Sequence, residues 1–275
     1  MLASLDRARM WFGRVLVVLT ALVLLAACAT GRSNHPSLRV LFIGNSLTYV
    51  ANLPAVFDTL ASQSTRPTHS EMLVSGGATL SERLADGSAE RALKSGAYDI
   101  VVLQERGGDF LGGFKPDSGK RADDALRELA ALALRFHVRP MLLGTYQIDP
   151  RFSRAIVDAE TSAASRHSVT YIPVSDGLQR AITEFPAGHW FDEDGMHPGP
   201  DLALLEAVRL YQTLFDAAPP EGDVVVSAPM YPPSAHFPVA VVDGSNFEPS
   251  NTQFARSHVY SSELVSRIMK LAERN

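Results

Sequence analysis

Short apolar runs alternate along the chain with longer segments in which apolar residues recur every three or four positions. The runs at 38–43, 98–104, 139–146 and 168–176 have the length and composition of buried strands. The amphipathic spacing between and after them predicts helices at 53–60, 80–93, 118–136, 152–166 and 199–215. Continuous apolar strands separated by amphipathic helices predict an α/β fold with a mostly parallel sheet that is covered on both faces.

The first residues break this pattern. Arg7, Arg9 and Arg14 precede the apolar stretch VLVVLTALVLLAAC at 15–28, which ends in small residues. These are the charged, apolar and small-residue regions of an export signal, and the stretch is short for a membrane span. Its last four residues resemble a bacterial lipobox, which implies a lipid anchor on Cys28, the single cysteine of the chain. A simple cleaved signal and an N-terminal membrane anchor are the alternatives.

The chain therefore divides into four parts. Residues 1–28 are the expected lipoprotein signal peptide, 29–37 a polar tether, and 38–217 the main domain. Residues 218–275 are rich in proline, and we expect this C-terminal extension to pack on the main domain. With 46% hydrophobic residues, the chain can build a globular core. The net charge of −5, without a long basic run, argues against a nucleic-acid-binding protein.

Polar residues stand where the predicted strands end. Ser46, Gln104 and Tyr146 each close or follow a strand. The carboxyl ends of parallel strands meet at one edge of a sheet, where ligands bind in folds of this class. Ser46, in the stretch IGNSLT, is the candidate nucleophile. Its alternative role is that of a helix cap, because Asn and Ser favour helix starts and Gly favours turns.

A serine needs a base to act as a nucleophile near neutral pH. The stretch DEDGMHP places Asp194 three residues before His197. In a turn, this spacing lets the carboxylate reach Nδ1 of the imidazole and leaves Nε2 for the serine. Asp192 and Glu193 are competitors for the carboxylate role, and the whole loop could instead only cap the helix that follows it.

The prediction is spatial: Ser46, Asp194 and His197 should converge within hydrogen-bonding reach at one open site, although they lie far apart in sequence. An alternative keeps the serine but takes the base from the C-terminal extension, where His236 and His258 lie.

Acyl transfer also needs hydrogen-bond donors for the oxyanion that develops on the substrate. The backbone N–H of Ser46 is one candidate, if this residue opens a helix. A second is the stretch SGGAT, where Gly77, or Gly76 by a shift of one residue, brings a backbone N–H close to a ligand. The third is the side-chain amide of Gln104. Each could equally be structural, as a glycine turn or as a polar residue that closes a strand.

The order of these features resembles the SGNH (GDSL-like) hydrolases. IGNSLT is similar to the first block of that family, with Ser46 as nucleophile; GGAT is similar to the glycine block, with Gly77; and DEDGMHP is similar to the last block, with Asp194 and His197. The resemblance spans residues 38–215. It implies a three-layer α/β/α flavodoxin-like fold and ester hydrolysis without a metal or another cofactor.

The third block departs from the family pattern. Where the family usually has an asparagine in a G-x-N-D setting, this chain has LQERGGD. Some carbohydrate-esterase branches use a glutamine in this role, so Gln104 is the expected substitute.

A lipid anchor at Cys28 with Ala29 after it favours the outer membrane, facing the periplasm or the surface, and this location brings O-acetylated glycans within reach. The expected function is therefore hydrolysis of a small-molecule or glycan ester, with removal of short acyl groups from carbohydrate as the first expectation. A lipase or thioesterase of the same family is the alternative within the enzyme class. A non-catalytic glycan-binding lipoprotein on the same scaffold is the alternative outside it.

Overall fold

The computed structural model describes residues 37–273 except 97 and 251. The expected signal peptide, the lipobox cysteine Cys28 and the tether up to residue 36 lie outside the described residues. None of the helices within the described ranges is both long and apolar enough to cross a membrane.

The main sheet has six strands in the order β5-β4-β3-β1-β2-β7. Five are parallel to one another, and β7 pairs antiparallel with β2 at one edge. The strands of this sheet are β1 Leu38–Gly44, β2 Thr68–Val74, β3 Ile100–Leu103, β4 Arg139–Leu143, β5 Thr170–Ile172 and β7 Val242–Asp243. The mostly parallel α/β sheet predicted from the sequence is thus confirmed.

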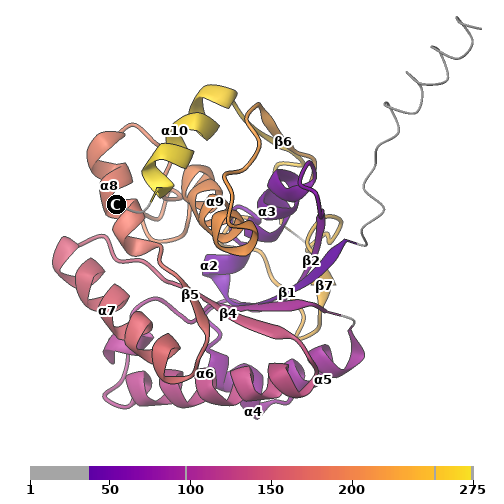
Figure 1. Cartoon of the computed structure of the whole chain (residues 1–275), viewed down its shortest axis with the longest axis vertical. Coiled ribbons are helices and arrows are strands. Elements are labelled where there is room, and N and C mark those ends of the chain that lie inside the picture. The colour runs from indigo at the N-terminus through magenta and orange to yellow at the C-terminus, as the bar shows by residue number, and fades with distance from the viewer. Residues whose placement is uncertain (1–36, 97, 251, 274–275) are drawn as a thin grey trace, which may run out of the picture. The chain divides into compact units, whose positions relative to one another are not determined.

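Helices cover both faces of this sheet, which gives three layers (Figure 1). The helices on one side are α4 Leu80–Ala85, α5 Ser88–Ser95, α6 Ser118–Arg135 and α7 Pro150–Arg166. Those on the other side are α2 Ser46–Tyr49, α3 Leu53–Ala61, α8 Ser175–Glu184, α9 Pro200–Phe215 and α10 Ser262–Ala272. A short 3-10 turn, η1 Asp109–Leu111, precedes α6.

Strand β1 lies at the centre of the sheet and shows how the two cores arise. Val40 and Phe42 point into the apolar cluster under α3 and α9, whereas Leu41 and Ile43 point into the cluster under α4 and α6. Successive side chains of a strand alternate between faces, so a continuous apolar run is what a strand buried on both faces requires. This buried strand ends at Gly44, directly before Asn45 and Ser46.

Three elements differ from the sequence prediction. The helix predicted at 80–93 is two helices, because Gly87 adopts a left-handed conformation (φ 69°) between α4 and α5. Strand β2 was not predicted, since its first four residues are all polar and only its last three are apolar; β7 covers only part of its free edge. Helix α8 was also missed, because its first residues continue directly from the segment predicted as a strand at 168–176.

The described residues of the C-terminal extension, 218–250 and 252–273, pack against the main domain. They supply β7 to the large sheet, a separate two-stranded sheet of β6 Val224–Val226 and β8 His258–Tyr260, and helix α10. This segment also contacts the start of the domain: Phe237 packs on Tyr49 with ring centroids 4.6 Å apart, and the amide of Asn52 donates to the carbonyls of Pro229 and Gly244 at 2.6 and 2.8 Å.

Candidate active site

The turn after β1 holds Ser46 at the start of a short helix. Asn45 is its extended N-cap, and its side-chain oxygen accepts a hydrogen bond from the N–H of Leu47 at 3.0 Å. Gly44 is required by space, because a Cβ there would lie 2.1 Å from Oγ1 of Thr48. The sequence Gly-Asn-Ser therefore produces a tight strand-to-helix turn, in which Ser46 is 9% exposed.

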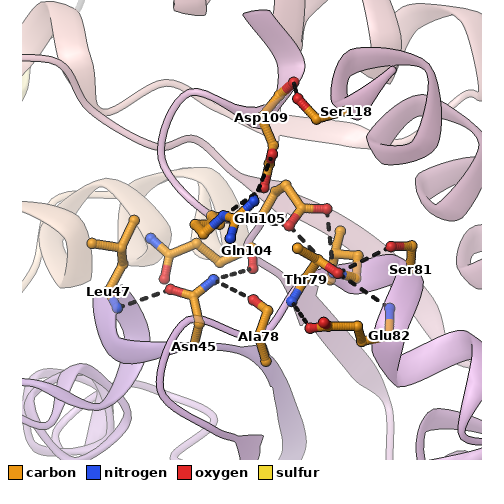
Figure 2. Close-up of polar contacts among 12 residues, drawn as sticks. Asn45, Leu47, Ala78, Thr79, Ser81, Glu82, Gln104, Glu105, Asp109 and Ser118 are labelled. Atoms are coloured by element: carbon orange, nitrogen blue, oxygen red, sulfur yellow. Dashed lines mark hydrogen bonds and ion pairs between the residues drawn. The ribbon is translucent and has the colours of Figure 1, made fainter. Parts of the chain in front are cut away.

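The glycine loop after β2 lies beside this turn. The amide of Asn45 donates to the carbonyl of Ala78 at 3.1 Å, which ties the two loops together (Figure 2). Gly77 has a φ of 68° and no atom within 4 Å of the position of a Cβ. Glycine is thus needed there for its conformation and not for lack of space. Gly77 lines the same cavity as Ser46, whereas Gly76 lines a neighbouring one.

The structure brings Asp194 and His197 together. Oδ2 of Asp194 lies 2.5 Å from Nδ1 of His197, and its Oδ1 accepts the N–H groups of Met196 and His197 at 2.9 and 3.0 Å. Burial by itself raises the pKa of Asp194, but the hydrogen bonds from His197 and Met196 outweigh it and lower this pKa to about 2. The carboxylate is therefore ionised at neutral pH and orients the ring so that Nε2 faces away from it.

Further contacts fix the loop that carries this pair. The N–H of Asp192 donates to the carbonyl of His197 at 2.9 Å, and Phe191 and Pro198 form an antiparallel bridge. The hydroxyl of Tyr146, in the loop after β4, donates to the carbonyl of Met196 at 2.8 Å. Burial raises the pKa of Tyr146 well above its usual value, so this hydroxyl remains a donor.

Ser46, Gly77 and His197 line one cavity of about 350 Å³, a volume that suits a small ligand. Its other lining residues come from the loops after β1, β3 and β4 and from the histidine loop: Asn45, Leu47, Arg106, Gly107, Phe114, Tyr146, Gln147, Ile148 and Met196. Among the described residues, neither the Ser46 hydroxyl nor Nε2 of His197 has a hydrogen-bond partner, so the two are not bonded to each other. Such contacts are often long in free enzymes and tighten only around a substrate.

Gln104, the third expected oxyanion donor, is not among the residues that line this cavity. Its side chain is 1% exposed and turns into the core, where its oxygen accepts from the Thr48 hydroxyl at 2.6 Å and its amide donates to Glu206 at 3.3 Å. Burial raises the pKa of Glu206 well above its usual value, which favours the neutral form of this carboxyl. The Gln104 amide, which the sequence suggested as an oxyanion donor, is thus hydrogen-bonded to Glu206 beneath the nucleophile turn.

The competing candidates lie elsewhere. Neither His236 nor His258 lines the cavity, and His258 instead packs against Tyr260 with ring centroids 4.4 Å apart. No side-chain bond joins Asp192 or Glu193 to the His197 ring within the described residues. The described part of the chain also contains no cluster of three or more His, Cys, Asp or Glu residues that could hold a metal ion.

Sequence reasoning missed several lining residues, of which Arg106 is the most informative. It lies in the same LQERGGD stretch as Gln104, two positions further on, and it lines both this cavity and a second one beside it. The exposed apolar side chains of Phe114, Ile148 and Met196 were also missed, since isolated apolar residues in polar loops give no periodic signal.

Comparison with known proteins identifies relatives by fold and not by sequence. No protein-family model matches the chain, and no curated protein matches its sequence. A DUF4886 family protein from Bacteroides uniformis matches with a TM-score of 0.51 and 19% identity, covering 66% of this chain and 84% of its own. TesA matches with a TM-score of 0.51 and 18% identity, covering 64% and 97%.

Axe2, an acetylxylan esterase from Geobacillus stearothermophilus, matches with a TM-score of 0.52 and 14% identity, covering 66% of this chain and 96% of its own. TesA and Axe2 are SGNH hydrolases. At these identities the likeness establishes a shared fold, and the resemblance to SGNH hydrolases predicted from the sequence is confirmed at that level.

Proposed function

We propose that this protein is a serine hydrolase of carboxylic esters, with Ser46 as nucleophile, His197 as general base and Asp194 as the group that orients the histidine. The observation that carries this proposal is the 2.5 Å contact between Asp194 and Nδ1 of His197, at a cavity that Ser46 also lines. A buried serine at a strand-to-helix turn and an oriented imidazole are the two groups that acyl transfer by this mechanism requires.

The reaction proceeds through two similar steps. His197 takes the hydroxyl proton of Ser46 as the serine oxygen bonds to the ester carbonyl carbon, and the carbonyl electron pair moves onto oxygen. That pair then returns, the bond to the alcohol breaks, and His197 gives its proton to the leaving alcohol. A water molecule attacks the acyl-serine in the same way, loses a proton to His197, and releases the acid as the proton returns to Ser46.

The negative oxygen needs donors that are already in place. The backbone N–H of Ser46, at the start of α2, and the N–H of Gly77 are the proposed donors. Support for Gly77 comes from its place in the lining of the cavity and from the bond between Asn45 and Ala78, which holds the glycine loop against the nucleophile turn.

For the substrate we keep short acyl esters of carbohydrate as the first proposal. Axe2, an acetylxylan esterase, shares the fold, and an exported protein would meet acetylated glycans. A specific observation favours a second class, that of esters with a larger apolar group. Phe114, Ile148 and Met196 are 52%, 51% and 65% exposed, and all three line this cavity. Exposed apolar side chains gathered at one place are typical of ligand sites.

Two measurements test the reaction. A fluorophosphonate probe should label the wild-type protein at Ser46, and p-nitrophenyl acetate should be hydrolysed with a burst of p-nitrophenol. The Ser46→Ala variant should remain folded, take no label and lose turnover. A folded wild-type protein that is neither labelled nor active would support the non-catalytic glycan-binding alternative. Comparison of acetylated sugars with longer acyl esters then separates the two substrate classes.

We further propose that the protein is lipid-anchored in the cell envelope through Cys28, with the outer membrane as the expected membrane. Labelling with an alkyne fatty acid should mark the wild-type chain and spare a Cys28→Ser variant, which should leave the membrane fraction. Equal labelling of both would reject the anchor, and it would leave the esterase proposal untouched.

A further inference from the structure

The proposed oxyanion donors are the N–H of Ser46 itself and that of Gly77, which lies on one side of Ser46. Strand β1 is hydrogen-bonded to β2 on one side and to β3 on the other. The residues that follow β2 and β3 therefore flank Ser46, which follows β1. Gly77 occupies the β2 side. On the β3 side, Gln104 is turned into the core, and the first cavity-lining residue after it is Arg106.

Arg106 is held in one orientation. Its Nε and one terminal nitrogen donate to the two oxygens of Asp109 at 3.0 and 3.1 Å. Asp109 is itself buried at the start of η1, where its backbone carbonyl accepts from Ser118, as Figure 2 shows. The ring of Phe114 lies 3.6 Å from the guanidinium carbon. A bidentate carboxylate and a stacked ring together fix the plane of the guanidinium group.

The fixed group still has donors to offer. A guanidinium carries five N–H bonds and stays charged at any pH at which a protein is folded. Asp109 uses two of them, and the remaining ones have no partner among residues 37–273 as described. The guanidinium group is also partly exposed, at 30% for the side chain. Burial raises the pKa of neighbouring Glu105 to about 8, which favours the neutral form of this carboxyl beside the guanidinium.

We propose that Arg106 is a catalytic residue that donates a hydrogen bond to the ester carbonyl oxygen from the β3 side as that oxygen becomes negative. It takes the role that the sequence suggested for Gln104. Gln104 and Thr48 are then positioning residues that hold the nucleophile turn from beneath, through the 2.6 Å bond between them. This inference rests on the proposed ester hydrolysis and names a residue of that same site.

The test compares single variants on p-nitrophenyl acetate. If Arg106 is an oxyanion donor, Arg106→Ala should lower kcat by about 10²–10³-fold and leave KM nearly unchanged. Added guanidinium ion should restore part of the kcat that Arg106→Ala loses. It should restore none of the kcat that Gln104→Ala loses. The matched control is Arg121→Ala, which removes the same charge from a residue that lines the second cavity and not the cavity of Ser46, and should keep kcat close to that of the wild type.

A second variant guards against misfolding. Arg106→Lys keeps a cation above Phe114 but loses the planar fork, so it should stay folded and lie between the wild type and Arg106→Ala in kcat. A further comparison separates the roles. Because Gln104 and Thr48 are bonded to each other, the kcat losses of Gln104→Ala and Thr48→Val should be less than additive in their double variant.

Three outcomes would overturn the inference. One is an Arg106→Ala variant with wild-type kcat in a protein whose Ser46 is labelled by fluorophosphonate; the proposed esterase would then stand without this residue. Another is an Arg106→Ala variant in which kcat is unchanged and KM is raised only for esters that carry a carboxylate, which would make Arg106 a residue that binds the substrate. The third is a wild-type protein that is neither labelled nor active, and here the inference fails together with the proposed function.

Discussion

The two halves of the proposed catalytic apparatus are held in place in different ways. The nucleophile turn, residues 44–52, is buried almost throughout, whereas the histidine loop, residues 191–198, is exposed at its tip. Asn45, Thr48 and Asn52 are at most 1% exposed. Each is bonded to a segment far away in sequence: Asn45 to the glycine loop, Thr48 to the end of β3, and Asn52 to the C-terminal extension.

The histidine loop uses its own residues instead. Asp194 bonds both the ring and the backbone of His197, and Asp192 accepts the N–H of Gly195 at 2.9 Å. The bond from Tyr146 to the carbonyl of Met196 is the long-range contact to its tip. The comparison teaches that the nucleophile depends on the global fold and the base on a local turn. Substitutions in the loop should therefore change the chemistry, and substitutions that cut the contacts between the turn and the C-terminal extension should change stability.

The largest effect is expected from Asp194→Asn. The amide keeps an oxygen for the N–H groups of Met196 and His197, so the turn should survive. It no longer stabilises the imidazolium and can favour the wrong tautomer of His197, so kcat on p-nitrophenyl acetate should fall by about 10³–10⁴-fold. Melting temperature and circular dichroism would check the fold. The control is Asp192→Asn, with a carboxylate that does not reach the ring. Equal losses in the two variants would show that the charge of the loop, and not the contact with Nδ1, matters.

The next largest effect is on stability, at Asn52. This residue is in the left-handed region at φ 50°, caps α3, and donates to two buried carbonyls of the extension. Asn52→Ala strains the backbone, removes the donor from the Pro229 carbonyl and leaves the Gly244 carbonyl with its bond from Tyr231, which should lower the free energy of unfolding by about 2–4 kcal/mol. Urea unfolding measures it.

The control for Asn52 is Asn246→Ala. Asn246 is an exposed asparagine that bonds Asp243 at 3.0 Å, and its loss should change the free energy of unfolding by less than about 0.5 kcal/mol. The folded fraction of Asn52→Ala should still have the wild-type kcat. A large fall in kcat without a fall in stability would contradict the division between the two regions.

This division also explains what the sequence could reveal. Asp194 and His197 interact across three residues, so their spacing alone predicted the contact that the structure contains. The parallel sheet was equally readable, because β1, β3 and β4 are apolar on both faces and stand between amphipathic helices. Strand β2 was not readable, since its first four residues are polar and Glu71 bonds Arg39 and Tyr98 at a partly buried position.

The supports of the nucleophile turn were beyond sequence reasoning for a different reason. Gln104 was a sound candidate by residue type, but which way a side chain points after the end of a strand depends on what packs there. Glu206, nine residues after His197 on α9, provides a buried carboxyl that draws the amide of Gln104 into the core. No local pattern links these two residues, so the sequence could not exclude Gln104 or favour Arg106.

A smaller effect is expected from removal of the long-range contact of the histidine loop. Tyr146→Phe keeps the ring, which packs 6.0 Å from Phe191, and deletes the hydroxyl that donates to the carbonyl of Met196. A single hydrogen bond contributes about 1 kcal/mol, so kcat should fall by roughly 3–10-fold with KM nearly unchanged. The matched control is Tyr231→Phe, which loses hydroxyl bonds to carbonyls of the extension and should lower stability while kcat stays constant. If Tyr231→Phe lowered kcat as much as Tyr146→Phe, the loop would not be the element that Tyr146 supports.

The smallest effect is the acid dependence of stability that Asp194 contributes. Its pKa is about 2 in the folded protein, below the value of about 3.9 expected in the unfolded chain. A lowered pKa in the folded state stabilises fully above the unfolded value, and the stabilisation is lost as pH falls from about 4 towards 2. Because the group is well exposed to solvent, the contribution should be below about 1 kcal/mol.

The melting temperature of the wild type should therefore exceed that of Asp194→Asn by a small margin above pH 4, and the margin should close as pH falls through this window. A margin that grows with acid would show that the carboxylate does not hold the loop. The nucleophile turn should be indifferent to this window, because Asn45, Thr48 and Asn52 carry no charge that could be titrated. The pH dependence of the difference between the wild type and Asp194→Asn thus reports on the histidine loop and not on the nucleophile turn.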